Sequence, residues 1–88
     1  MISFEGDAWE DYQFWQQNDQ FILRKIDQSM KDIQRNPFDG VGKPEALRQN
    51  LFGLWSRRIT HDHRLVSWVK QGDKGFEIAT AQCRGHYE

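Results

Sequence analysis

An apolar helical repeat that stops at a proline is the feature that most constrains the fold. Its apolar side chains recur every three or four residues, at Ile22, Leu23, Ile26, Met30 and Ile33. This spacing places them on one face of a helix. The pair Asn36-Pro37 ends the repeat, because proline lacks the amide that a continuing helix needs. The pattern predicts a helix that begins at Asn18 or Asp19 and buries one face.

The opposite face of this helix carries charges of both signs, at Arg24, Lys25, Asp27, Lys31, Asp32 and Arg35. Opposite charges three or four residues apart support a helix in water. We therefore interpret this face as solvated rather than RNA-binding.

The residues before this helix predict a short strand and a first helix. Residues 2–4 alternate in polarity, and Asp7 precedes a helical pattern over residues 8–17. The Asp7 carboxylate is expected to cap this helix, with Glu10 reaching back to the cap. Helical spacing indicates a core role, rather than an RNA-stacking role, for Ala8, Trp9, Tyr12 and Trp15.

After Pro37 the pattern changes to that of strands. Two prolines and two glycines predict an ordered loop over residues 37–44. The β-rich segments that follow are residues 54–60, 64–69 and 76–83, with turns at 61–63 and 71–74. We predict an α+β domain: a short N-terminal strand and two helices on one face of an antiparallel sheet, with the other face free for a ligand.

Length and composition favour one domain spanning residues 1–88. The 88-residue chain is 38% hydrophobic and contains a single cysteine, Cys83. A chain this short builds one core, and one cysteine forms no intrachain disulfide. With neither a signal peptide nor a membrane-spanning run, a reducing cytoplasm is the expected location.

The net charge of −1 conceals an uneven distribution. Residues 1–23 contain five acidic side chains and no Lys or Arg, whereas residues 43–64 contain five cationic side chains and two acidic ones. A basic cluster of this kind holds an anionic ligand or forms a solvated basic face, and the charges alone leave both interpretations open.

The register of the hairpin around residues 61–63 decides which arginine lies beside Arg64. A three-residue loop pairs Thr60 with Arg64 and puts Arg58 on the same sheet face as Arg64. A two-residue loop would put Arg57 there instead. We favour Arg58.

The basic segment and the C-terminus supply the groups that RNA cleavage needs without a metal. The reaction requires a base for the 2′-hydroxyl, a cation for the phosphate and an acid for the leaving 5′-oxygen. Glu45, Arg64 and the pair His86-Tyr87 are the candidates. The competing interpretations are a surface carboxylate at Glu45 and a frayed terminus at His86-Tyr87.

Two other chemistries are disfavoured. His61, His63, Cys83 and His86 offer metal-ligand atoms, but the chain lacks the paired cysteine spacing of a zinc site, and we expect no metal and no cofactor. Cys83 lies at an inward-type strand position, where a small buried hydrophobe is more usual than a nucleophile.

Several ordered blocks closely resemble the YoeB family of toxins within the RelE/ParE superfamily. They are NPFDGVGKPEALRQNLFGLWSRRITHDHRLV at residues 36–66, CRGHY at 83–87 and SFEGDAWEDYQFWQQNDQFILRKI at 3–26. The resemblance covers almost the whole chain. It implies a microbial-ribonuclease-like fold and a ribosome-dependent mRNA endoribonuclease. It also implies a cognate YefM/Phd-type antitoxin, through which the toxin contacts operator DNA.

The resemblance also assigns roles to individual residues. It implies Glu45 as general base, Arg64 as the phosphate-stabilising cation, His86 as general acid and Tyr87 as a supporting aromatic. The basic residues expected to contact the mRNA backbone are Lys43, Arg48, Arg57 and Arg58. Gly85 stands where some relatives have an aromatic residue, and the chain continues to Glu88.

Two alternatives from other functional classes remain at this stage. One is a non-nucleolytic toxin of the same superfamily directed at gyrase, and the other is an RNA-binding protein that does not cleave. The set Glu45, Arg64 and His86 favours the nuclease, because a pure binder needs no acid and base. The chain is also a candidate for homodimer formation.

Overall fold

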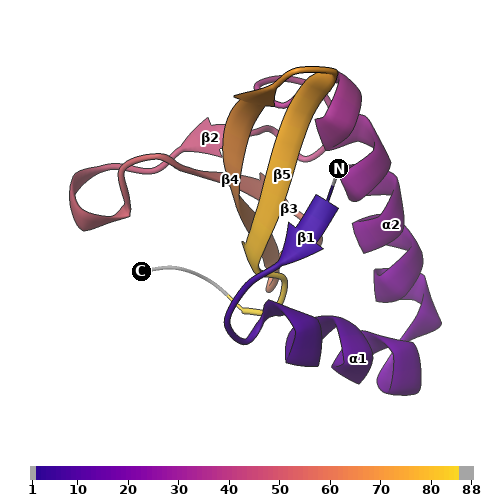
Figure 1. Cartoon of the computed structure of the whole chain (residues 1–88). Helices are drawn as coiled ribbons and strands as arrows, with labels where there is room; N and C mark the ends of the chain where they lie inside the picture. Colours follow the sequence, from indigo (N-terminus) through magenta and orange to yellow (C-terminus); the bar gives the residue numbers. More distant parts are fainter. Residues whose placement is uncertain (1, 86–88) are drawn as a thin grey trace.

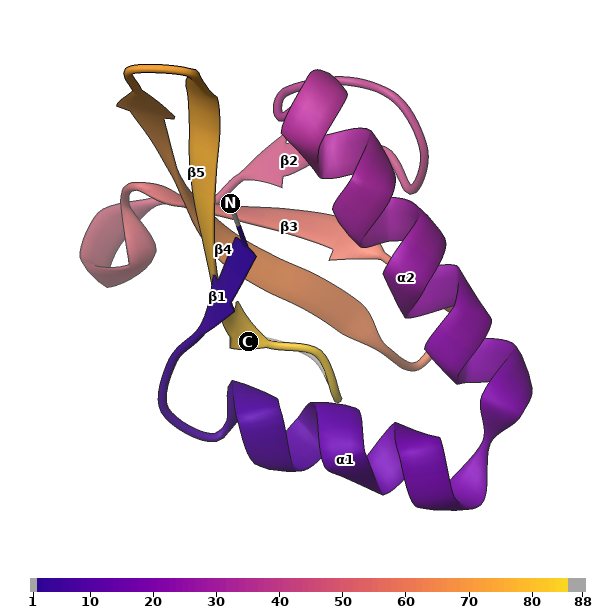
Figure 2. The same ribbon diagram turned by 45° about the vertical axis from the view of Figure 1, so that its right-hand side comes forward.

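Two helices cover one side of a single five-stranded sheet (Figures 1 and 2). The computed structural model describes residues 2–85, with Asn50 described by its backbone alone. The elements in chain order are β1 (Ile2–Phe4), α1 (Ala8–Asn18), α2 (Gln20–Arg35), β2 (Glu45–Ala46), the 3-10 turn η1 (Gln49–Leu51), β3 (Leu54–Arg58), β4 (Arg64–Gly72) and β5 (Gly75–Gln82). Neither helix is long and apolar enough to cross a membrane.

The sheet has the order β1-β5-β4-β3-β2. Strands β2 to β5 pair antiparallel, and β1 pairs parallel with β5. The predicted α+β fold is confirmed, with β1 as the one departure from a purely antiparallel arrangement. The short strand β2 falls in a stretch for which the sequence predicted no element.

Helix α2 forms where its repeat predicts it. The Asp19 carboxylate accepts from the amides of Phe21 and Ile22 at 3.0 and 3.1 Å, which identifies Asp19 as the cap. The buried face of the helix contains Ile22, Ile26, Ser29, Met30 and Ile33. Most of these side chains pack with Trp15, Ile59, Leu65 and Cys83 in the core under the sheet.

Helix α1 begins at the predicted residue, but the hydrogen bond at its start differs from the predicted one. Asp7 occupies the cap position without a side-chain cap hydrogen bond, and its backbone carbonyl accepts from the Asp11 amide at 2.9 Å. The expected carboxylate cap is therefore wrong. Trp15 is buried as predicted, whereas Trp9 is 48% exposed and lies over Phe4 at the edge of the core.

The β3–β4 hairpin differs from the predicted register by two residues. Arg58, rather than Thr60, is the partner of Arg64, and Thr60 instead bonds to His63 inside the turn. Side chains alternate across a strand, so a shift of two residues leaves the same side chains on each face. Arg58 and Arg64 therefore share a face, as predicted. The next turn is also tighter than expected, because β4 runs to Gly72 and β5 begins at Gly75.

Candidate active site

Strands β2, β3 and β4 bring three of the predicted site residues, Glu45, Arg58 and Arg64, to one face. Glu45 pairs with Ser56, and Arg58 pairs with Arg64. Cross-strand partners point to the same side, and so do residues two apart on one strand. Together they surround a cavity of about 300 Å³ whose lining residues are Gly42, Lys43, Pro44, Glu45, Ser56, Arg58 and Arg64.

The charge of this cavity suits an anion. Three of its lining side chains are cationic, Lys43, Arg58 and Arg64, and Glu45 is its carboxylate. Arg58 is exposed and Arg64 is half-buried. Guanidinium groups bind the forked oxygens of a phosphate in a geometry that an ammonium group does not reproduce.

Gly42 joins the loop that carries Lys43 and Glu45 to strand β3. Its carbonyl accepts from the Arg58 amide at 2.8 Å. Its φ is +81°, and a Cβ atom there would lie 2.6 Å from the Arg58 carbonyl oxygen. Only glycine combines this conformation with so close an approach of two backbones.

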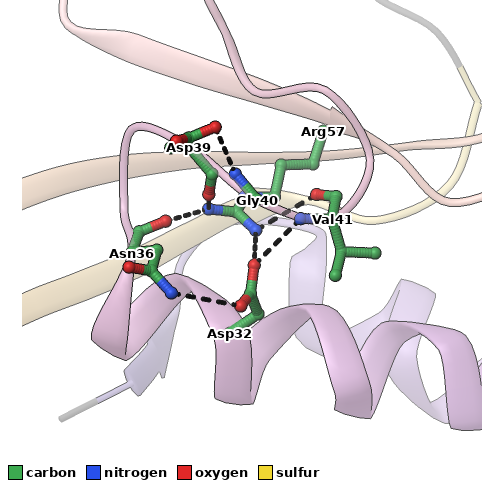
Figure 3. A network of polar contacts seen from close by, with 6 residues as sticks. All are labelled: Asp32, Asn36, Asp39, Gly40, Val41 and Arg57. Carbon is green, nitrogen blue, oxygen red and sulfur yellow. Dashed lines mark hydrogen bonds and ion pairs between the residues drawn. The ribbon is translucent and has the colours of Figure 1, made fainter.

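The preceding loop is held from the other face of the sheet by Arg57 (Figure 3). The Arg57 side chain is buried, and its Nη1 lies 2.6 Å from an Asp32 carboxylate oxygen. Its two terminal nitrogens also donate to three backbone carbonyls of the loop, those of Asn36, Asp39 and Val41. One buried guanidinium therefore organises the segment that leads into the cavity.

This position corrects two expectations from the sequence. Arg57 was predicted to contact RNA, but it points away from the cavity because it alternates with Arg58 along β3. Asp32 was placed on a solvated helix face, but it binds Arg57. Asp27 likewise accepts from the Tyr12 hydroxyl at 2.7 Å.

Arg64 is fixed by its own turn. Its Nη1 donates to backbone carbonyls in the turn, at 2.8 Å to Thr60 and 3.2 Å to His63. Among residues 2–85, no partner forms a hydrogen bond with Nε or Nη2 of the Arg64 guanidinium.

The C-terminal segment returns to the same corner of the sheet. The Arg64 amide donates to the Gly85 carbonyl at 2.9 Å, and the Gly85 amide donates to His63 Nδ1 at 2.9 Å. His86 and Tyr87 lie outside the described residues, so their roles as acid and supporting aromatic stay predictions. The last described residue is nonetheless bonded to the residue that carries the candidate phosphate-binding group.

The sequence matches a known protein family over almost its whole length. Residues 4–87 match the family described as YoeB-like toxin of bacterial type II toxin-antitoxin system. Toxin YoeB of Escherichia coli K12 is 48% identical over 98% of both chains. The chain belongs to the YoeB family. It is accordingly a toxin of a type II toxin-antitoxin system.

Solved structures of YoeB proteins share the fold. A YoeB/ParE toxin from Agrobacterium tumefaciens superposes with a TM-score of 0.91 at 41% identity, covering 98% of both chains. Staphylococcus aureus YoeB, solved in a complex with YefM, gives 0.86 at 44% identity over 99% of this chain and 97% of that one. A YoeB dimer from S. aureus superposes with a TM-score of 0.84 at 46% identity over 98% of this chain and 95% of that one.

In this YoeB family member, two residues near the cavity differ from the sequence prediction. Arg48 is exposed just before η1 and does not line the cavity. Ser56 does line it and was missed, although counting two residues back from Arg58 along the strand would have found it. A larger hollow of about 400 Å³ lies near β1, but none of its lining residues is an arginine: Ser3, Glu5, Trp68, Lys70, Glu77, Ile78 and Ala79.

Two alternative chemistries concern Cys83 as a nucleophile and a metal site. Cys83 is fully buried, and burial raises the pKa of its thiol to about 12, so it is a core residue as predicted. Within residues 2–85, no three His, Cys, Asp or Glu side chains gather in a group that could hold a metal ion.

Proposed function

We propose that this toxin is an endoribonuclease that cleaves mRNA on the translating ribosome. The observation that carries the proposal is the joint presence of Glu45, Arg58 and Arg64 around one cavity. A carboxylate beside two guanidinium groups combines a proton acceptor with a phosphate-binding site. A gyrase-directed toxin or a plain RNA-binding protein would not need this combination.

The cleavage proceeds by attack of the 2′-hydroxyl on the adjacent phosphorus. Glu45 takes the hydroxyl proton while the 2′-oxygen forms its bond to phosphorus, and the bond from phosphorus to the 5′-oxygen breaks. Arg64, through its Nε and Nη2 edge, stabilises the charge that grows on the phosphate oxygens. A general acid, which we propose is His86 supported by Tyr87, protonates the leaving 5′-oxygen. These groups supply base, cation and acid without a metal.

The remaining basic side chains would hold the RNA backbone. Arg58 and Lys43 line the cavity and are the nearest candidates, with Arg48 farther along the exposed chain. A cavity of about 300 Å³ contacts only a short stretch of RNA. Dependence on the ribosome follows, because a second body that orients the strand lowers the barrier by supplying geometry.

The partners follow from the same surface. We propose a cognate YefM-type antitoxin, whose acidic or disordered segment covers Arg58 and Arg64 and so blocks RNA. Operator DNA would be contacted through that complex, in the cytoplasm. S. aureus YoeB has been solved as a dimer, which makes a homodimer of this chain a hypothesis for solution scattering.

Mapping of mRNA 5′ ends tests the proposal. The purified chain is added to a defined mRNA with and without ribosomes stalled on it. Cuts within codons are expected with ribosomes and weak cleavage without them. A matched mRNA with deoxyribose before the scissile phosphate should resist cleavage, because the nucleophile is missing. Intact mRNA in every reaction, or DNA breaks on expression, would refute the nuclease.

A further inference from the structure

The segment that ends the described chain is tied to helix α1 at several points. Trp15 Nε1 donates to the Cys83 carbonyl at 2.9 Å in the buried core, and the Cys83 amide donates to the Asp11 carboxylate at 3.2 Å. The Arg84 guanidinium lies 3.6 Å from the centre of the Phe14 ring. Figure 2 shows this segment running beside α1. Residues 83 and 84 are therefore anchored before the chain reaches Gly85.

Gly85 is then held by two neighbouring residues of the β3–β4 turn. Its amide donates to His63 Nδ1 at 2.9 Å, and its carbonyl accepts from the Arg64 amide at 2.9 Å. Gly85 has a φ of +81°, and among the described residues a Cβ atom there would meet only the Gln82 side-chain amide, at 3.7 Å. Glycine is required here for its backbone conformation rather than for space.

His63 contacts Gly85 through its side chain. Its ring lies edge-on to Trp15, with centroids 4.7 Å apart and an interplanar angle of 74°. Its backbone carbonyl also accepts from Arg64 Nη1 at 3.2 Å. One residue therefore contacts the C-terminal segment through its side chain and the candidate phosphate-binding guanidinium through its backbone.

We propose that His63 is a positioning residue that holds the C-terminal segment, at Gly85, beside Arg64, and that cleavage depends on this contact. The hydrogen bond from the Gly85 amide to Nδ1 holds the backbone of the last described residue beside Arg64. His86, the proposed acid, is the next residue in the sequence. The inference rests on the proposed nuclease activity and adds to it a residue that touches neither RNA nor the reacting atoms.

A pair of amide substitutions separates this role from simple packing. The Asn carbonyl oxygen is attached to Cγ, as Nδ1 is in histidine, so His63→Asn can still accept from the Gly85 amide. In His63→Gln the acceptor lies one bond farther out. Both variants lose the ring contact with Trp15, so their stabilities should fall together. The exposed His61→Asn change in the same turn is the control.

Three measurements are made on the full-length variants. Thermal unfolding compares stability, hydrogen exchange of the Gly85 amide reports the contact, and cleavage of ribosome-bound mRNA gives kcat and KM. We expect His63→Asn to stay within a few-fold of wild type. We expect His63→Gln and His63→Ala to lose about 10- to 100-fold in kcat at unchanged KM, with faster exchange at Gly85, because a small misplacement of a catalytic group has effects of this size.

Two results would overturn the inference while the nuclease stands. One is wild-type kcat in His63→Gln despite fast exchange at Gly85, and the other is a loss in His63→Asn as large as in His63→Gln. A wild-type chain that cuts no mRNA would refute the proposed function instead, with the protection of the Gly85 amide unaffected. If His63→Ala does not fold, the comparison of His63→Asn with His63→Gln is sufficient to test the inference.

Discussion

Arg57 and Asp32, which are 25 residues apart in the sequence, form an ion pair of 2.6 Å that joins β3 to α2. Arg57 is 1% exposed, and the Asp32 side chain is 22% exposed. The pair also lies at the start of the loop that delivers Lys43 and Glu45 to the cavity. It links the stability of the fold to the geometry of the site.

Removal of the carboxylate should destabilise the protein strongly. Asp32→Ala leaves a buried guanidinium without its counter-charge, although three backbone carbonyls still accept from it. We expect a loss of about 3 kcal/mol in the free energy of unfolding, measured by urea denaturation. Gln34→Ala, on the exposed side of the same helix, should change it by less than about 0.5 kcal/mol. Equal losses in the two variants would show that the pair contributes little.

The same pair predicts how stability depends on pH. The hydrogen bonds from the Arg57 side chain and then from the Val41 amide lower the pKa of Asp32 below its ordinary value of 3.8. A folded-state pKa below the unfolded one gives stability that is complete well above about pH 4 and is lost as the pH falls through the folded value.

As the pH falls from 6 to 3, the free energy of unfolding should therefore decrease less for Asp32→Asn than for the wild-type protein. Urea denaturation at several pH values measures this difference. Burial raises the pKa of Asp11, which acts with the opposite sign, but that contribution is common to both proteins and cancels in the comparison. Parallel curves for the two proteins would exclude Asp32 as a source of the acid sensitivity.

Gly42→Ala should damage the site more than an ordinary glycine substitution. The new Cβ would meet the Arg58 backbone at 2.6 Å in addition to adopting a positive φ. Gly6→Ala is the matched control, because Gly6 has a φ of +53° with no atom within 4 Å of the added Cβ. We expect about 1 kcal/mol for Gly6→Ala and at least about 2 kcal/mol for Gly42→Ala.

Cleavage of ribosome-bound mRNA should distinguish these glycines as well. Gly42→Ala displaces the loop that carries Glu45, so its rate should fall at temperatures where it is still folded. Gly6→Ala should cleave at the wild-type rate. A Gly42→Ala protein with normal cleavage would show that the contact with Arg58 does not set the position of Glu45.

Substitutions within the cavity test the chemistry directly. Glu45→Gln removes the proton acceptor at nearly constant shape and should lower the single-turnover cleavage rate by about 10²- to 10⁴-fold with the fold intact. Glu77→Gln, at an exposed position of β5 outside the cavity, is its control. Near-normal cleavage by Glu45→Gln would exclude Glu45 as the base.

The Arg64→Lys variant tests whether a positive charge at this position is sufficient for cleavage. An ammonium group keeps the charge but not the planar fork, so we expect a loss of at least about 10²-fold. Arg24→Lys on the exposed side of α2 should be unaffected. If Arg64→Lys cuts at the wild-type rate, Arg64 acts as a point charge or holds the turn.

Local patterns in the sequence predicted β1, both helices and strands β3 to β5, but not β2. The repeat from Ile22 to Ile33 defined α2, and period two defined β3 to β5, because helices and strands each impose a fixed spacing on buried side chains. The same alternation put Arg58 and Arg64 on one face despite an error of two residues in the register. The family and its proposed catalytic residues followed from ordered blocks of sequence.

Only the tertiary structure decided which charged residues stabilise the fold and which line the cavity. Arg57 and Arg58 are adjacent and chemically identical, yet one is buried against Asp32 and the other lines the cavity. The partners of Arg57 and of Gly85 come from distant segments, and contacts across such separations leave no periodic pattern in the sequence. Spacing determined the secondary structure, whereas the packing of α2 and the C-terminal segment against the sheet decided which of its polar groups are structural and which are free for a ligand.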